Sequence, residues 1–541
     1  MTTTVLDVLL AAAPPLTVLV LMVGFRWGGS KAGPAGWFVA LVIAALRFGA
    51  GLDVLGYAHV RALVLTVDVV YIIWAALLLY HVVDQAGAMR VIAAWFTHLT
   101  GDDVLRVLLL GWVFTSFLQG VGGFGVPVAI VAPLLVGLGL TPLAAVLIPS
   151  LGHGWAVTFG SLASSFIALV GVTGLDPDLL APPAALLLGV MAFGSGLLAA
   201  HAFAGWRGLR RALPAVLAIG FVMAIVQYVL ATNGLWNVGA SGASLAGLAV
   251  GMWVTRWPFY RRGGASVVVP AEDAPTPAAV APDADAARPA LSFPLAIAGY
   301  VVLVVLAVAI KGIAPIRTLF TPFTFAIAVP EVSTSLGWVT PATPDLGLNL
   351  LSHTGAVLVY SSVIAYVLYR RRGCYGPGAE RVILSGVLKK GVRPALGIMA
   401  MVGMATVMSN AGMTRALAEW LAGAVPLDLY AFVATAIGTL GSFMTGSNTN
   451  SNAVFASLQQ ETAVLLGLNV LLVLGVQTAS AAIASVFAPA KIIVGASTVG
   501  AGGDEGLILR RLLVYGGVLL LVLALLAFVL LRVDGAAAPA M

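Results

Sequence analysis

Long apolar stretches separated by short polar loops recur from one end of the chain to the other. A bilayer is crossed by roughly 20 apolar residues in a helix, so the pattern predicts an all-α polytopic membrane protein with about 12–14 membrane segments. The apolar stretches lie at 5–23, 35–50, 63–83, 104–118, 128–150, 155–171, 183–203, 212–231, 239–255, 293–311, 346–369, 395–412, 429–445, 453–488 (interrupted) and 512–531. The first of them is expected to be a retained span, because no basic stretch precedes it.

Composition excludes an ordinary soluble domain. Of the 541 residues, 61% are hydrophobic and only 9% are charged, whereas soluble domains carry about 25% charged residues. The net charge of +6 does not indicate a nucleic-acid partner, because basic residues of membrane proteins usually mark cytoplasmic loops. Such basic clusters lie at 207–211, 256–262, 370–372, 389–393 and 510–511, and their spacing lets all of them face the cytoplasm.

The chain divides into two halves. Residues 256–290 are rich in Pro and Ala, carry charge and show no periodicity, which is typical of a solvated linker. We expect this linker to be cytoplasmic and to join a first membrane half, 1–255, to a second, 291–541.

A weak internal repeat relates the halves. "SFLQG" at 116–120 matches "SFMTG" at 442–446, and "LGL" recurs at 138–140 and 466–468. In that register Phe159 falls on Phe487. Paired, interrupted apolar segments in corresponding places are the best sequence indication of a transporter's substrate site.

The first interrupted segment reads "LQGVGGFGVPVAIVAP", 118–133. Glycines cost about 1 kcal/mol each inside a helix, so we expect a re-entrant hairpin over about 104–137 with a glycine-rich tip. Its bare amides suit an anion. The alternative is close helix packing through small residues. The candidate substrate-binding residues at this tip are Gln119, Gly120, Gly122, Gly123 and Gly125.

The second interrupted segment, "GSNTNSN" at 446–452, places small polar residues between apolar flanks. We expect a second hairpin, over about 429–465, in which these residues cap the returning helix and face a ligand. The alternative is a loop that is simply hydrated. The candidate substrate-binding residues here are Ser447, Asn448, Thr449 and Asn450.

Ionisable residues at membrane depth are functional candidates by default. "PSLGHGWAVTFGS" (149–161) and "SAAIASVFAPAKII" (480–493) contribute His153 and Lys491 at corresponding breaks. Both are candidates for substrate binding and for proton coupling. The alternatives are a packed histidine and a snorkelling lysine. Asp68 is a third proton-coupling candidate, and a structural Arg47–Asp68 ion pair is the simpler interpretation.

In these segments the chain is similar to the L-lactate permease family. The resemblance is strongest over 111–142 and 394–515, which includes "FLQGVGGFGVPVAI", "MSNAG" at 408–412 and "GSNTNSNAVFASLQ" at 446–459. It implies a proton-coupled transporter of lactate and often glycolate. It also implies two inverted repeats with re-entrant hairpins and broken helices, an elevator-type motion and a homodimer in a bacterial inner membrane. Ser447-Asn448-Thr449 matches the "SNT" tip triplet of the related ion transporter superfamily.

The sequence departs from the family pattern at three positions. Gln119 stands where members commonly carry an acid, Asn448 replaces another acid, and Lys491 lies where a glycine-rich stretch is usual. Substrate identity and coupling ion are therefore open at this stage.

These observations together predict a symporter of small 2-hydroxy monocarboxylates, with no cofactor and no metal. The alternatives are sodium coupling or another organic anion. An anion channel and a membrane-embedded enzyme are weaker alternatives, because a channel does not explain paired interruptions and no HExxH or paired-carboxylate motif is present.

Overall fold

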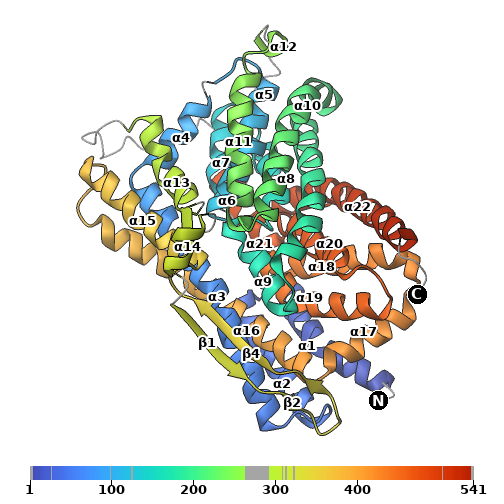
Figure 1. Cartoon of the computed structure of the whole chain (residues 1–541). Coiled ribbons are helices and arrows are strands. Elements are labelled where there is room, and N and C mark those ends of the chain that lie inside the picture. Colours follow the sequence, from blue (N-terminus) through green and yellow to red (C-terminus); the bar gives the residue numbers. More distant parts are fainter. Residues whose placement is uncertain are drawn as a thin grey trace.

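The computed structural model describes residues 4–25, 27–97, 99–123, 126–261, 291–307, 309–310, 313–320, 323–501 and 504–537. Residues 262–290 of the expected linker and the tip residue Gly125 lie outside these ranges, while the start of that linker, 256–261, is described and includes a short helix. Helices dominate the described chain (Figure 1). Those of the first half are α1 (Val5–Val23), α2 (Gly29–Leu46), α3 (Leu52–Gln85), α4 (Ala88–Thr97), α5 (Asp103–Leu108), α6 (Thr115–Val121), α7 (Val126–Gly137), α8 (Pro142–His153), α9 (Ser164–Thr173), α10 (Pro177–Thr232), α11 (Gly239–Val254) and α12 (Pro258–Arg261).

The second half contributes ten further helices among the described residues. They are α13 (Phe293–Ala307), α14 (Ala314–Phe320), α15 (Thr354–Arg371), α16 (Ala379–Asn410), α17 (Met413–Ala424), α18 (Tyr430–Thr445), α19 (Asn448–Leu465), α20 (Val470–Ser485), α21 (Pro489–Thr498) and α22 (Glu505–Ala537). A π-helical segment, Leu109–Phe114, joins α5 to α6.

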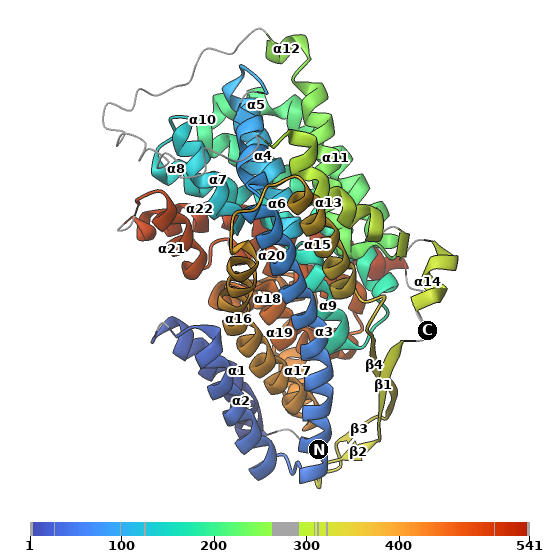
Figure 2. The ribbon, with the colours of Figure 1, turned by 90° about the vertical axis from the view of Figure 1, so that its left-hand side faces the viewer.

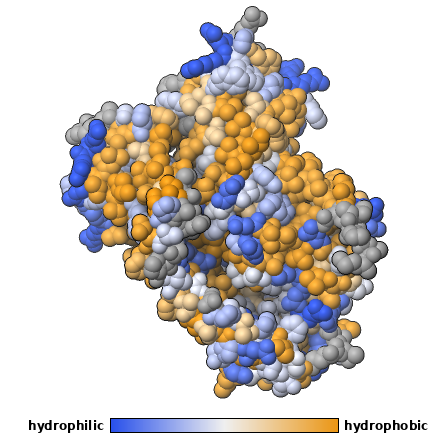
Figure 3. Space-filling view, in the orientation of Figure 1, coloured by the Kyte–Doolittle hydropathy of each residue, from blue (hydrophilic) through white to orange (hydrophobic). Residues whose placement is uncertain are grey.

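The predicted helical membrane fold is confirmed. Within the described residues, eight helices are long and apolar enough to cross a membrane, or up to ten if each of two bent pairs is one span. Apolar side chains form broad patches over the surface seen in Figure 3, and hydrophilic ones lie mainly along its edges, with a smaller group near its centre. Exposed apolar residues on long helices, such as Leu46 and Val529, are expected where a helix faces lipid.

One long helix supplies two of the predicted segments. α10 bends sharply at Ala204 and Gly205, where the φ of Gly205 is +56°. Glycine adopts this left-handed conformation without steric cost. The chain therefore turns back on itself at this point (Figure 1), and the arms correspond to the apolar stretches 183–203 and 212–231.

Four short strands were not predicted. β1 (Thr324–Val329) pairs antiparallel with β4 (Thr343–Asn349), and β2 (Val332–Ser333) pairs with β3 (Val339–Thr340). They form a thin layer beside the lower end of α3 (Figure 2), where Arg61 donates to the carbonyl of Pro341 at 2.7 Å. β4 contains the start of the apolar stretch 346–369, which was expected to be helical. In a short run, apolar residues alone do not distinguish a strand from a helix.

α22 links the outer ends of the two interrupted segments. Its Arg510 lies beside Leu209 of α10, near Arg211, which holds the start of α5. Its Arg532 pairs with Asp428, just before α18. From Arg510 to Arg532 a helix rises about 33 Å at about 1.5 Å per residue, close to the roughly 30 Å thickness of the hydrocarbon core. The two segments therefore begin near opposite ends of α22.

The expected Arg47–Asp68 ion pair is wrong. Arg47 pairs instead with Asp7 of α1 at 2.8 Å, and Asp68 pairs with His353, the residue that caps α15. Arg47 ends α2 whereas Asp68 lies midway along α3, so the two side chains are offset along the helix axes.

Candidate functional site

Two helices from different halves begin at the same place. α19 starts after Gly446, whose φ of +68° ends α18, and Ser447 caps it by accepting from the amide of Asn450 at 3.2 Å. α9 starts at Ser164. Ser165 and Thr449 are each the second residue of their helix, and their hydroxyl oxygens lie 3.1 Å apart. The positive ends of two helix dipoles therefore meet.

A buried polar network surrounds this junction. Asn448 donates its side-chain amide to Thr158 at 3.0 Å. Asn452 donates to the Ser165 carbonyl and to the Thr478 hydroxyl, both at 2.9 Å. Thr158 in turn donates to the Thr478 carbonyl at 3.2 Å. All of these side chains are buried, so the network joins α19 and α20 to the segment between α8 and α9.

A second polar layer supports the first. Gln477 of α20 donates to the Ser451 hydroxyl at 3.2 Å. It also accepts from Gln459 at 3.1 Å, and Tyr430 donates to Gln459 at 2.7 Å. These bonds join α18, α19 and α20 along the hairpin, which keeps the first turn of α19 in position against α9.

The first tip contacts the same segment from its other side. A methyl group added at Gly123 would lie 1.8 Å from the Ser161 hydroxyl, and one added at Gly160 would lie 2.9 Å from the Gln119 carbonyl. Gly123 also has a φ of +58°, so only glycine fits at this position without strain. The stretch 158–165 therefore lies between the two tips.

The backbone of this stretch is strained. Ser161, Leu162 and Ala163 have φ values of 47°, 55° and 64°. The left-handed region costs roughly 1–2 kcal/mol for each residue with a Cβ. Strain of this kind persists where the surrounding structure holds it, and it clusters at functional sites. Here it turns the chain so that α9 starts beside α19.

Several buried acceptors at the site have no hydrogen-bond partner within the described residues. They include the side-chain oxygens Gln119 Oε1, Asn448 Oδ1 and Asn452 Oδ1. An unmade buried hydrogen bond costs about 1–3 kcal/mol. A ligand that carries a hydroxyl donor would satisfy such acceptors, while a carboxylate suits the two helix N-termini.

His153 and Lys491 lie outside the hydrogen-bonded network. His153 ends α8, is buried, and bonds through Nδ1 to the Pro149 carbonyl at 2.6 Å, while Nε2 has no partner in the described structure. Lys491, half-buried in the first turn of α21, donates to Ser485 at 3.3 Å. No described acid forms an ion pair with it. Its ammonium is close enough to His153 to act on the ring electrostatically.

The other candidates have different surroundings. Ser447 is the helix cap described above. Asn450 faces α2, with its side-chain nitrogen near Gly29. Gly120 packs against Ser241 of α11, and a Cβ there would lie 2.7 Å from the Ser241 nitrogen. Gly122 caps α6. Asp68 pairs with His353, whose ring stacks on Tyr71 at 5.0 Å.

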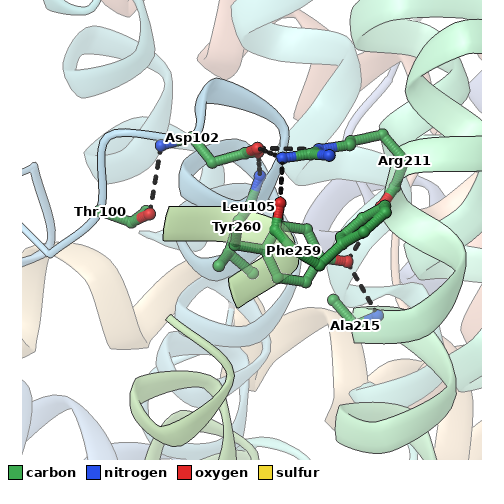
Figure 4. A network of polar contacts seen from close by, with 7 residues as sticks. All are labelled: Thr100, Asp102, Leu105, Arg211, Ala215, Phe259 and Tyr260. Carbon is green, nitrogen blue, oxygen red and sulfur yellow. Dashed lines mark hydrogen bonds and ion pairs between the residues drawn. The ribbon is translucent and has the colours of Figure 1, made fainter. Parts of the chain in front are cut away.

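A separate anchor holds the outer end of the first segment (Figure 4). Asp102 caps α5 by accepting from the Leu105 amide at 3.0 Å, and its other oxygen accepts from Arg211 at 2.8 Å. The guanidinium lies over the Phe259 ring at 4.1 Å, and Tyr260 donates to the Arg211 carbonyl at 2.9 Å. This network fixes α5 to the scaffold formed by α10 and α12.

The sequence pattern did not single out Thr158, Ser161, Ser165 and Thr478. The stretch "TFGSLASS" at 158–165 was a usable signal, because four of its eight residues are Ser or Thr and it lies between apolar flanks. His353 was also missed. The quoted "MSNAG" motif lies elsewhere, with the Ser409 carbonyl accepting from Trp338 beside β3 at 3.0 Å.

The chain matches one protein family along nearly its whole length. The family described as L-lactate permease matches residues 7–533. The chain belongs to the L-lactate permease family. As a permease of this family it is a transporter rather than an enzyme, and a multi-pass protein of the bacterial plasma membrane.

Characterised relatives cover almost the entire permease. The glycolate permease GlcA of Escherichia coli (strain K12) is 27% identical over 537 residues, which is 93% of this chain and 92% of that protein. The L-lactate permease of Bacillus subtilis (strain 168) is 27% identical over 548 residues, 95% of each chain. The crystal structure of the Alcanivorax borkumensis YdaH transporter aligns at 15% identity with a TM-score of 0.43, covering 86% of this chain and 85% of that one. That similarity is too low to support an argument about this fold.

Proposed function

We propose that this permease is a secondary active symporter of small 2-hydroxy monocarboxylates such as L-lactate or glycolate, driven by protons. The relatives named above are L-lactate and glycolate permeases. In this proposal the substrate binds at the junction of α9 and α19. Gln119, Gly123 and Ser161 form one wall, and Asn448, Thr449 and Thr478 form the other.

The observation that carries the proposal is the meeting of Ser165 and Thr449 at 3.1 Å. The backbone amides in the first turns of α9 and α19 can together bind one carboxylate. The unpartnered oxygens of Asn448 and Gln119 suit the 2-hydroxyl group as a donor. A dicarboxylate would need a second cationic group in addition to Lys491, and the proposed walls of the site contain none.

The burial of the network supports alternating access. Thr158, Ser165, Asn448 and Thr478 are all buried, so a substrate reaches them only after a conformational change. The two tips, the strained stretch and α19 to α21 form one packed unit. In our proposal this unit moves against the α3 and α16 scaffold as an elevator, in a homodimer.

The coupling groups in our proposal are His153, Lys491 and Asp68. Lys491 attracts the carboxylate by charge pairing, and the charge of Lys491 acts on the His153 ring. Asp68 and His353 form a second protonatable pair on α3 and α15. Because Gln119 and Asn448 stand where the family commonly has acids, our proposal assigns the coupling to these other ionisable groups.

Uptake into proteoliposomes tests the proposal. We expect lactate or glycolate to accumulate when a pH gradient is imposed and not when only a sodium gradient is present. Accumulation driven by sodium alone would support the sodium-coupled alternative. Flux that never exceeds the substrate gradient would indicate a channel, and preference for a dicarboxylate would contradict the assigned substrate class.

A further inference from the structure

A groove far from the substrate site runs between α10 and α22. It encloses about 640 Å³ and is lined by residues from the bend of α10 and from the first half of α22. The two helices touch at Gly194, where an added Cβ would lie 2.5 Å from Leu519. The groove contains His201, Trp206, Arg511 and Tyr515, which lie nearer the bend of α10 and the start of α22 than this contact does.

Along α22, the groove is lined first by charged and then by apolar side chains. Residues 507, 510, 511, 514, 515 and 518 all line the groove, and this spacing places them on one helix face. The arginines come first, at 510 and 511. Val514 and Val518 follow, one and two turns further from the helix start, and are 63% and 49% exposed. Leu198 of α10 extends the apolar wall.

A polar pair lies between the charged and the apolar parts. His201 and Tyr515 are hydrogen bonded at 2.9 Å. The His201 ring is also 5.3 Å from the ring of Trp206, whose side chain is 71% exposed. Trp and Tyr are enriched at the membrane–water interface, so this level of the groove corresponds to the headgroup region.

Exposed arginines lie close to the bend of α10 and to the start of α22. Arg207, Arg210, Arg510 and Arg511 are exposed, and no described acid forms an ion pair with any of them. Arg211 differs, because Asp102 neutralises it. The same clusters mark the cytoplasmic side by the positive-inside bias, and the cytoplasmic leaflet carries anionic lipids.

We propose that the groove between α10 and α22 binds an anionic phospholipid, with its phosphate at Arg510 and Arg511 and an acyl chain along Val514, Val518 and Leu198. Guanidinium groups pair well with phosphate oxygens. The apolar wall distinguishes a lipid from free phosphate, which would leave Val514 and Val518 exposed. Bound there, the lipid joins α22 to α10, which also packs against α8 and α20.

Native mass spectrometry of the purified full-length chain tests this proposal without measuring transport. The detergent-solubilised protein is mixed with equal amounts of phosphatidylglycerol and phosphatidylcholine that carry the same acyl chains. We expect phosphatidylglycerol to remain bound. The variant Arg510→Gln/Arg511→Gln should lower the bound fraction at least about tenfold, equivalent to about 1.4 kcal/mol.

A matched control and a second groove variant separate the possible causes. Arg371→Gln/Arg372→Gln removes two adjacent exposed arginines outside the groove and should bind phosphatidylglycerol within about twofold of the wild type. Val514→Trp fills the apolar part without changing charge and should lower binding like the arginine variant. Wild-type binding by either groove variant, equal loss in the control, or full displacement by millimolar inorganic phosphate would overturn the proposal.

Discussion

The hydroxyl oxygens of Ser165 and Thr449 lie 3.1 Å apart although the residues are 284 positions apart in sequence. Each belongs to the first turn of a helix that begins inside the protein, one in each half of the chain. Because both helices present their N-terminal ends, the contact gathers donors and positive partial charge in a buried place. This geometry underlies the substrate predictions below.

Asn448→Ala should lower uptake at least about tenfold, equivalent to about 1.4 kcal/mol. The side chain contributes an unpartnered acceptor and a donor to Thr158, and Thr158 keeps its bond to the Thr478 carbonyl. The fold should therefore persist. Uptake into proteoliposomes and the thermal midpoint in detergent measure both effects.

Ser447→Ala is the matched control for this substitution. Ser447 caps α19, so its loss should cost about 1 kcal/mol of stability and change uptake less. Near-normal uptake by the Asn448 variant would mean that the polar tip only caps its helix.

Lys491→Met should raise the apparent KM at least about tenfold, or about 1.4 kcal/mol, because it removes the cation nearest the tips while keeping the chain length. Initial rates of uptake over a range of substrate concentrations provide the measurement. Lys389→Met, an exposed lysine of α16, should leave KM unchanged. An unchanged KM for both variants would identify Lys491 as a membrane anchor.

Asp68→Asn should reduce accumulation driven by a pH gradient at least about fivefold, about 1 kcal/mol, while substrate exchange at equal pH continues. The amide cannot carry the proton that the Asp68–His353 pair would share. Asp53→Asn, an exposed acid at the start of the same helix, is the control. Loss of exchange together with accumulation would instead indicate a structural role for the pair.

Ala163→Gly should stabilise the protein by about 1 kcal/mol, because glycine adopts the observed φ of 64° without the Cβ clash. Ala168→Gly lies within regular α9 and should destabilise by about 1 kcal/mol. Thermal unfolding in detergent compares the two. The same sign of change in both variants would contradict the assignment of strain to residues 161–163.

Asp102→Ala should destabilise the protein by about 2 kcal/mol, because it removes both the N-cap of α5 and the buried carboxylate that accepts from Arg211. Asp103→Ala is the control, since its pair with Arg106 is partly exposed on both sides and worth less than about 1 kcal/mol. If both variants shift the unfolding midpoint equally, the network in Figure 4 contributes no more to stability than an exposed ion pair.

The sequence by itself determined the helical membrane class and the places where helices break. Apolar runs long enough for a bilayer, the glycines at 120–123 and the polar run at 447–452 act locally, through helix propensity and the cost of burying polar groups. Local rules of this kind can be applied to a segment without knowing its neighbours. The family pattern could be recognised for the same reason.

Only the tertiary structure decided which residues meet. Arg47 pairs with Asp7 rather than with Asp68, Asp68 pairs with His353, and the second tip forms hydrogen bonds with Thr158 and Ser165. Each choice joins helices that are distant in sequence, so it depends on how the helices pack and how far their side chains are offset along the axes. Composition and spacing contain no information about that offset, because the same amphipathic pattern is compatible with several packed neighbours.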